Sequence, residues 1–341
     1  MTHPLTIIGN EGSPYSRKMR AVLRYRRIPH VWVAQMGPGY VPPPPVPVKV
    51  IPVLVWHDDD GTMRESMVDS TPQIQRLERE FSGRSLVPAD PALGFLSALI
   101  EDYADEWGTK FMFHYRWTDE AGIAWARRHL MLQIDHSVPA DKLEQFAQWF
   151  GDRQIGRRAV VGSSEETRHI LEDGYRRLLL ALDGLLEQRR FLFGDRPAAA
   201  DFGLYGQLSQ LCGFDPSSSR LAERLAPRVV AWTERLEDLS GWVVDAAQWL
   251  PRDTALPALR PLLEEIGASY VPFLLANAAA KQSGATQVSC TIRGERWQQN
   301  VFAYQAKCLG WLREQFNGLS GTDREWVRSG LAGTGCEALL G

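Results

Sequence analysis

The sequence predicts an α/β domain at the N-terminus, followed by a larger all-α helical domain and a mainly helical extension. Two short apolar runs, at residues 5–9 and 30–34, flank a helical pattern. This spacing is typical of a strand–helix–strand crossover and hence of two parallel, buried strands. From about residue 92, apolar residues instead recur with the period of amphipathic helices. We therefore predict domains over residues 1–83 and 90–250, with an extension over 251–341 packed on the helical domain.

Composition and charge narrow the class of protein. With 44% hydrophobic and 23% charged residues, the chain has the composition of soluble globular proteins, and its net charge of −3 gives no reason to expect a nucleic acid partner. No apolar run is long enough to span a bilayer and the first residues lack a signal-peptide pattern, so we expect no membrane partner and a cytoplasmic location. Because the cysteines form no Cys-x-x-Cys pair and the histidines no His-x-x-x-His pair, we expect no metal site.

A helix should begin soon after the first strand, at Ser13 and Pro14. A serine hydroxyl can accept hydrogen bonds from the free N–H groups of a helix start, and proline suits the first helical position because its missing N–H costs nothing there. The positive end of a helix also favours an anion or a thiolate. Ser13 therefore has two interpretations, as a helix cap or as a donor to a ligand.

A loop and a hairpin should complete the first domain. Residues 42–47 are rich in proline, which removes backbone donors and disfavours helix, so this run should be extended or looped. Residues 50–56 and 62–67 then predict a hairpin turned at Asp60-Gly61.

Two features at the ends of this hairpin bear on a ligand site. Pro52 stands at the start of a strand, where a cis peptide bond is a possibility. After the hairpin, Ser70 or Thr71 suits the cap of a helix whose apolar face includes Ile74 and Leu77.

Helical patterns fill the second domain. In its first helix, five apolar residues share one stripe: Leu96, Leu99, Ile100, Tyr103 and Trp107. The opposite side is acidic: Glu101, Asp102, Asp105 and Glu106. Further helices are predicted over roughly 122–134, 140–152, 164–189, 201–213, 218–238 and 241–249. Asp201, three residues after Ala198, stands at the third position of a helix-start box. In the extension we predict a long helix through residues 271–278, a strand over 286–292 and a final helix over 297–316.

This order of elements resembles the glutathione transferase superfamily, whose first domain is thioredoxin-like and whose second is helical. Four motifs carry the resemblance, which covers about residues 5–250: Ser13-Pro14-Tyr15-Ser16, Val50-Ile51-Pro52, Asp69-Ser70 followed by Leu77-Glu78, and Phe193-Gly194-Asp195-Arg196-Pro197 with Ala200-Asp201-Phe202. The Ser13 motif resembles a glutaredoxin Cys-Pro-Tyr-Cys site with hydroxyls in place of both thiols, as in serine-type glutathione transferases. The Ile51 motif is similar to the family's Val-Pro element, and the Asp69 motif is similar to its acidic-Ser pair. The motif from Phe193 resembles the one that begins a helix in the family's helical domain.

The resemblance implies an enzyme, a glutathione transferase that conjugates or transforms a hydrophobic electrophile with glutathione thiolate stabilised by Ser13. It implies glutathione contacts for eight residues: Tyr15, Ser16, Arg17, Lys49, Ile51, Pro52, Asp69 and Ser70. Arg17 or Lys18 would meet the glycyl carboxylate. The electrophile would lie between the domains, with three aromatic candidates: Phe111, Tyr115 and Trp117. The resemblance also implies a homodimer.

The sequence departs from the family pattern in several places. The proline-rich run stands where the family has its second helix, so no motif supports Lys49 as a ligand residue. Ala198 replaces the usual Ser or Thr cap, and Glu65-Ser66 competes with Asp69-Ser70, which we prefer for its spacing to Leu77. A non-catalytic glutathione transferase-like binding protein and a glutathione-dependent isomerase or lyase remain alternatives, because one fold serves many functions. The resemblance does not account for residues 251–341.

Overall fold

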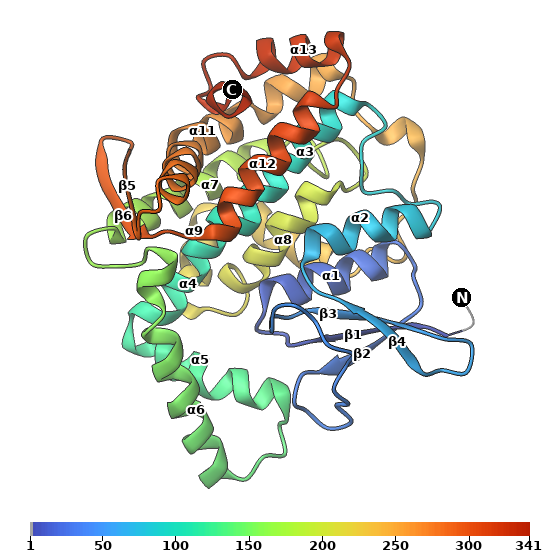
Figure 1. Ribbon diagram of the computed structural model, residues 1–341, viewed down its shortest axis with the longest axis vertical. Helices are drawn as coiled ribbons and strands as arrows, with labels where there is room; N and C mark the ends of the chain where they lie inside the picture. The colour runs from blue at the N-terminus through green and yellow to red at the C-terminus, as the bar shows by residue number, and fades with distance from the viewer. Residues whose placement is uncertain (1–2) are drawn as a thin grey trace.

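The computed structural model describes residues 3–341, except for the side chain of Ala246. A four-stranded sheet comes first, with the strand order β2-β1-β3-β4 (Figure 1). Its strands are β1 (Leu5–Gly9), β2 (His30–Ala34), β3 (Val53–His57) and β4 (Met63–Met67). β1 pairs in parallel with β2 and antiparallel with β3, and β3 and β4 form the hairpin. The predicted parallel pair and hairpin are confirmed.

One property of the second strand was predicted wrongly. All five residues of β1 are buried, but no residue of β2 is. β2 lies at the edge of the sheet, where one side has no neighbouring strand, whereas β1 lies inside it. Both strands have the same apolar character, so only their order in the sheet distinguishes them.

The two faces of the sheet are covered differently. Helices α1 (Pro14–Tyr25) and α2 (Ser70–Glu80) lie against one face, where Met19 packs with Ile7 in the main core (Figure 1). On the other face, Val46 of the proline-rich run packs against the cluster that contains Ile8. The run 42–47 is not helical, as predicted.

The two helices of this domain begin in different ways. Ser13 is the N-cap of α1, its Oγ accepting a hydrogen bond from the N–H of Ser16 at 3.3 Å, so the predicted cap is confirmed. α2 begins at Ser70 with Asp69 as its N-cap and no capping bond from a side chain, so the predicted cap at Ser70 or Thr71 is wrong. The Ser70 hydroxyl is engaged elsewhere, as described below.

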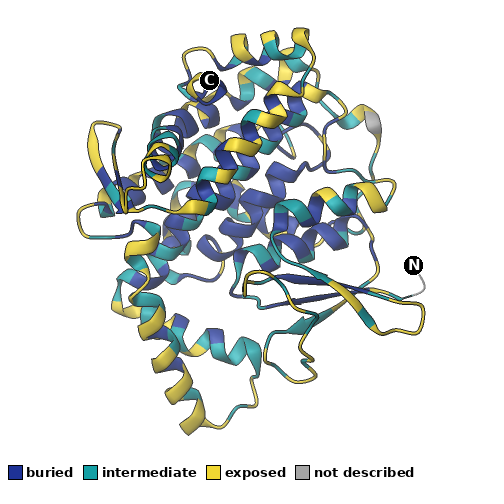
Figure 2. Cartoon of the chain, in the orientation of Figure 1, coloured by how far each residue is buried: buried dark blue, intermediate teal, exposed yellow. Residues whose placement is uncertain are grey.

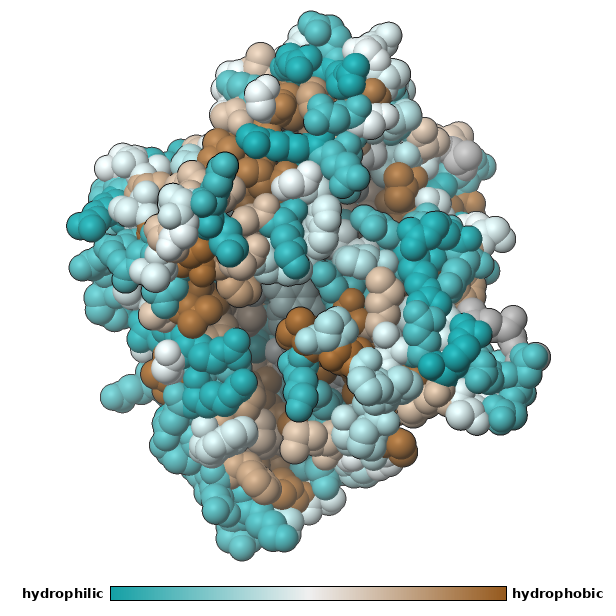
Figure 3. All heavy atoms as spheres, viewed as in Figure 1, coloured by the Kyte–Doolittle hydropathy of each residue, from teal (hydrophilic) through white to brown (hydrophobic). Residues whose placement is uncertain are grey.

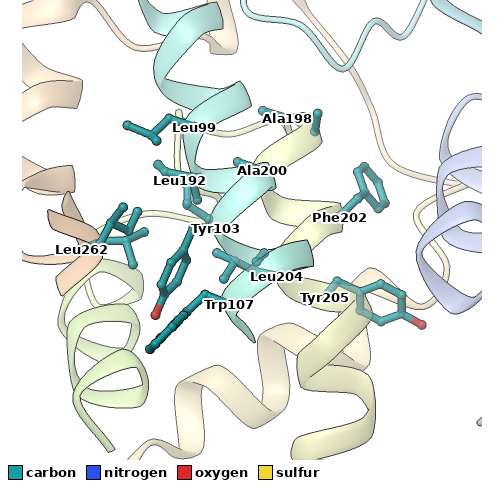
Figure 4. Close-up of a cluster of buried hydrophobic side chains, with 14 of the residues drawn as sticks. Leu99, Tyr103, Trp107, Leu192, Ala198, Ala200, Phe202, Leu204, Tyr205 and Leu262 are labelled. Carbon is teal, nitrogen blue, oxygen red and sulfur yellow. The ribbon is translucent and has the colours of Figure 1, made fainter. Parts of the chain in front are cut away.

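The helical region surrounds α8, in which every residue is buried (Figure 2). Figure 4 shows part of this core, where α3 and a π-helical turn, η1, run beside α8. The elements are α3 (Pro91–Tyr103), η1 (Ala104–Gly108), α4 (Thr109–Thr118), α5 (Glu120–Ile134), α6 (Ala140–Ile155), η2 (Arg158–Val161), α7 (Arg168–Leu186), α8 (Ala199–Leu211), α9 (Pro216–Leu225), α10 (Pro227–Leu236) and η3 (Ala246–Gln248).

Two helix predictions in this region are wrong. The run 218–238 is two helices that meet at Pro227, because proline cannot continue a helix from the preceding residue. The run 241–249 holds only the short turn η3. The helix-start box is confirmed, since the N–H of Ala198 donates to Asp201 Oδ2 at 2.8 Å.

The extension contains α11 (Arg252–Gln282), β5 (Gln287–Ile292), β6 (Glu295–Asn300), α12 (Ala303–Asn317), α13 (Gly321–Leu331) and η4 (Cys336–Leu340). α11 packs against α7 and α3, and α12 packs against α3 (Figure 1). The predicted final helix begins later than expected, because Trp297 belongs to β6, which pairs with β5. Within the described part of the chain, no helix is both long and apolar enough to cross a membrane.

Candidate functional site

Two loops that carry predicted site residues lie at the same end of the central strands β1 and β3. β1 ends just before the loop of Ser13, and β3 begins just after Ile51 and Pro52; because Ile8 pairs with Val53 in antiparallel register, these loops are neighbours. We call this region, defined by Ser13, Ile51 and Pro52, the thiol end of the site, after the part of glutathione that the sequence resemblance implies here. The space-filling view shows a hollow near the middle of the face that is turned to the viewer (Figure 3).

The start of α1 offers two donors at the thiol end. Ser13 Oγ accepts from the Ser16 N–H, and Ser13 O accepts from the Arg17 N–H at 3.1 Å. The Ser13 hydroxyl proton is not donated to any described residue. Pro14 has no N–H, and the second helical residue, Tyr15, has no acceptor within the helix. An O–H and an N–H are therefore available where the helix dipole favours negative charge.

The Ile51–Pro52 peptide bond is cis, as the sequence suggested. The Gln73 side chain holds this turn from α2, donating through Nε2 to Pro52 O at 3.2 Å and to Met67 O at 2.7 Å. The N–H and C=O of Ile51 bond to no other group among residues 3–341. They can therefore pair with an extended ligand backbone.

Asp69 and Ser70 are both engaged within the protein; we call them the γ-glutamyl end, after the part of glutathione that the sequence resemblance implies for this pair. Asp69 adopts a left-handed φ of 79°, and its Oδ2 accepts a hydrogen bond from the Tyr304 hydroxyl at 2.6 Å. Ser70 Oγ accepts from Lys18 Nζ at 3.2 Å and donates to Asp105 Oδ2 at 3.3 Å. Four segments far apart in sequence therefore meet at this end.

Lys18 is the centre of a buried ionic network. Its side chain is fully buried, and Nζ lies 2.6 Å from Asp105 Oδ2 and 2.7 Å from Glu101 Oε1. Thr71 Oγ1 donates to the same Glu101 oxygen at 3.2 Å. The network ties α1 and α2 of the first domain to α3 and η1 of the second. Lys18 is thus committed internally and does not face a ligand.

The acidic side predicted for the first helix of the second domain lies under neighbouring elements. Burial raises the pKa of Asp105 to about 6, although Lys18 opposes the shift. Burial, with the charges of Asp102 and Asp105, raises the pKa of Glu106 to about 8. Burial also raises the pKa of Asp102 to about 7, opposed by a hydrogen bond from Tyr270. For Lys18, burial alone would lower the pKa, but Asp105 and Glu101 hold it above its usual value.

Two models of one family match this chain. The model of the glutathione S-transferase N-terminal domain matches residues 7–85, and that of the glutathione S-transferase C-terminal domain matches residues 141–242. Together they match more than half of the chain. This chain belongs to the glutathione S-transferase superfamily. The predicted family and its fold, a thioredoxin-like domain followed by a helical domain, are confirmed.

Solved structures of similar proteins are distant in sequence. A glutathione S-transferase-like protein from Pseudomonas syringae is 16% identical, with a TM-score of 0.45 over 69% of this chain and 67% of that one. A glutathione S-transferase from Rhodospirillum rubrum F11 is 20% identical, with a TM-score of 0.42 over 74% and 98%. One from Methylobacterium radiotolerans, solved in complex with glutathione sulfonate, is 21% identical, with a TM-score of 0.37 over 71% and 99%. No curated protein matches.

Four other predicted residues of this glutathione S-transferase fold are placed as follows. Ser16 is buried beneath the loop, where its Oγ accepts from the Asn10 N–H at 3.3 Å. The Tyr15 hydroxyl donates to Asp105 O at 2.7 Å and so points towards η1. Arg17 donates to Glu11 O at 3.1 Å and pairs with the Glu237 carboxylate, just after α10. Lys49 is exposed. Of these four, Lys49 alone presents its side chain freely to solvent.

The three aromatic candidates do not share one surface. Phe111 and Tyr115 both contact Tyr175 of α7, with ring centroids 6.3 and 5.3 Å apart, and Phe111 is fully buried. Trp117 belongs to a second buried cluster together with Leu130 of α5. The structure therefore places Phe111 and Trp117 in the interior, in two separate clusters.

Sequence reasoning missed the residues that approach the site from other elements. Leu130 lies against the loop of Ser13, since a Cβ on Gly12 would fall 1.9 Å from Leu130 Cδ2. Tyr304 reaches Asp69 from the extension. Gln73 of α2 holds the Ile51–Pro52 turn from beneath. Lys18 was named as a possible partner of the glycyl carboxylate, but its pairing with Glu101 and Asp105 was not foreseen. The sequence shows the helical spacing of these residues, but no local pattern predicts a contact with a partner that is tens to hundreds of residues away.

Proposed function

We propose that this protein is an enzyme that binds glutathione across the thiol and γ-glutamyl ends and directs the glutathione thiolate at a hydrophobic electrophile, with Ser13 stabilising the sulfur. The observation that carries the proposal is the pair of free donors at the start of α1, next to the unpaired backbone of Ile51. This arrangement fits a cysteinyl ligand, because the ligand backbone can bond to Ile51 while its sulfur meets the helix start.

The chemistry needed at the thiol end is stabilisation of negative charge on sulfur. A free thiol has a pKa above neutral, and each charge-assisted hydrogen bond to the sulfur favours the ionised form. Ser13 Oγ is held in place by accepting from the Ser16 N–H at 3.3 Å, which leaves its own proton for the sulfur. The Tyr15 N–H and the helix dipole act in the same direction.

Two further glutathione contacts are proposed from charge, and the remaining predicted residues are proposed to shape the site. Asp69 provides a carboxylate for the α-ammonium group of glutathione, and Lys49 provides a cation for its glycyl carboxylate. Pro52 shapes the turn that presents Ile51. Tyr15, Ser16, Arg17 and Ser70 have internal partners and are proposed to shape the site around the ligand.

Calorimetric titration with glutathione tests the proposal. We expect saturable binding with one site per chain at millimolar ligand or below, the range typical of enzyme substrates. Absence of binding would reject the glutathione-dependent functions and leave a binding protein for another ligand. Binding without turnover of a chlorodinitrobenzene or other electrophiles would favour the non-catalytic alternative. If turnover leaves the concentration of free thiol unchanged, the isomerase or lyase alternative holds instead of conjugation.

Replacing Ser13 by alanine separates its two interpretations. We expect Ser13→Ala to slow turnover about tenfold to a hundredfold, as for loss of a hydrogen bond to a charged group, while changing the glutathione affinity less. Ser320→Ala is the matched control, because Ser320 caps α13 with the same kind of bond, to the Asp323 N–H at 3.1 Å. If both variants lose a similar, small amount of stability and neither loses turnover, Ser13 only caps the helix.

We also propose a homodimer, as the family resemblance implies, and a cytoplasmic location, as expected from the sequence pattern. Sedimentation velocity at micromolar concentration should give twice the mass of the 38.4 kDa chain. A species of one chain at all concentrations would contradict the homodimer.

A further inference from the structure

The extension supplies a residue to the γ-glutamyl end. The Tyr304 hydroxyl, on the first turn of α12, donates to Asp69 Oδ2 at 2.6 Å. Both residues are partly exposed, so the pair borders solvent and is not sealed in the core. It lies at the surface that a ligand bound to Asp69 would have to reach.

The first turn of α12 is held firmly in this position. Asn277 of α11 forms two hydrogen bonds with the backbone of Phe302, each 2.9 Å long, just before the helix begins. Gln305 is buried and donates through Nε2 to Glu106 O of η1 at 3.0 Å. Tyr304 is therefore presented to Asp69 by contacts on both sides of it in the chain.

A carboxylate can accept several hydrogen bonds, so one tyrosine does not exhaust Asp69. A phenol O–H on one oxygen restricts the rotation of the carboxylate and leaves lone pairs on both oxygens for another donor. Burial raises the pKa of Asp69, and the Tyr304 hydrogen bond opposes that rise. The tyrosine thus favours the charged form that a cationic partner needs.

We propose that Tyr304 is a positioning residue of the ligand site, which orients the Asp69 carboxylate so that it binds the α-ammonium group of glutathione. This inference rests on the proposed function. It gives the extension a role: α12 completes the γ-glutamyl end from outside the two domains that the family models match. The opposite interpretation of the same contact is a plug, in which Tyr304 occupies the place of the ammonium group and must leave before a ligand binds.

Tyr304→Phe separates the two interpretations, because it removes the hydroxyl and keeps the ring. We expect about a tenfold weaker affinity for glutathione by calorimetry and a matching rise in KM with kcat nearly unchanged, the effect of one lost hydrogen bond to a charged group. For glutaryl-cysteinyl-glycine, which lacks the α-ammonium group, wild type and variant should bind equally. Tyr270→Phe is the control, since Tyr270 donates in the same way at 2.7 Å to Asp102 Oδ2, a carboxylate that is not among the proposed glutathione contacts.

Each outcome has one meaning. Equal affinity of wild type and Tyr304→Phe for glutathione overturns the inference, and tighter binding by the variant establishes the plug instead. An equal loss for both ligands indicates a structural role and also overturns it. Failure of the wild type to bind glutathione rejects the proposed function itself. If Tyr304→Phe unfolds, Asp69→Asn replaces it, and loss of the preference for glutathione over its deamino analogue is then expected.

Discussion

The two ends of the candidate site are built in opposite ways. At the thiol end, Ser13 and Ile51 keep a hydroxyl proton and backbone groups free of partners within residues 3–341. At the γ-glutamyl end, Asp69 and Ser70 are bonded to Tyr304, Lys18 and Asp105. The first is a local structure, a capped helix start beside a turn. The second is a meeting point of α1, α2, η1 and α12.

This difference suits the two roles that we propose for the two ends. Free donors suit a site where charge develops on a ligand atom, because they need no rearrangement to meet it. Internally paired groups suit a site that binds a fixed charge, because partners hold each side chain in one orientation. Substitutions in the buried Lys18 network beneath the γ-glutamyl end should therefore affect stability strongly, and those at the thiol end should affect mainly binding and rate.

The largest expected effect is at Lys18. Lys18→Met leaves Asp105 and Glu101 buried without their cation, so we expect a loss of about 3–5 kcal/mol in the free energy of unfolding, measured in urea. Lys49→Met is the matched control on the exposed loop and should change stability by less than about 0.5 kcal/mol. Equal stability of the two variants would contradict the network. Adding Asp105→Asn and Glu101→Gln to Lys18→Met should recover much of the loss, because no buried charge then remains unpaired.

A smaller effect is expected from pH. The pKa of Glu106 is raised to about 8, so the folded protein keeps a proton that the unfolded chain releases above its ordinary pKa of about 4.3. Its contribution to stability is therefore complete at low pH and is lost as pH rises towards 8. Between pH 5 and 7 this group should lower the free energy of unfolding by up to about 1.4 kcal/mol per pH unit. Glu106→Gln should remove that part of the decline. Asp102 and Asp105, with pKa values of about 7 and 6, should maintain part of the slope.

Urea unfolding at pH 5, 6 and 7 measures this slope. Glu325→Gln, an exposed acid of α13, is the control and should follow the wild-type curve. Parallel curves for Glu106→Gln and wild type would show that Glu106 does not hold its proton in the folded state.

The smallest effect is expected at Lys49, which precedes Ile51 of the thiol end in the chain. An exposed cation that meets the glycyl carboxylate should contribute little, because water and salt screen it. Lys49→Ala should weaken glutathione binding about twofold to threefold at low salt, and the difference should vanish at about 0.5 M salt, beyond which screening is nearly complete. Calorimetry at two salt concentrations measures this. A difference that persists at high salt would place Lys49 in a closer contact than its exposure suggests.

Much of the thiol end could be predicted because its signals are local. The cap at Ser13 and the hairpin each depend on a few neighbouring residues and the physical chemistry of one turn. The prediction of helix for the segment 297–300 is wrong because the structure of this segment depends on a distant partner. Its residues fit the spacing of the following helix, but pairing with β5 made it a strand, and pairing is not a local property.

The sequence by itself determined the family, the order of strands and helices in the first domain, and the helix cap at Ser13, since each follows from residues close together in the chain. Only the tertiary structure decided that Lys18 is buried, although it stands among surface-like basic residues, and that Tyr304 meets Asp69 from 235 positions away. The physical reason is that a residue's own chemistry sets which partners it needs, whereas packing of the whole chain sets which partner it finds.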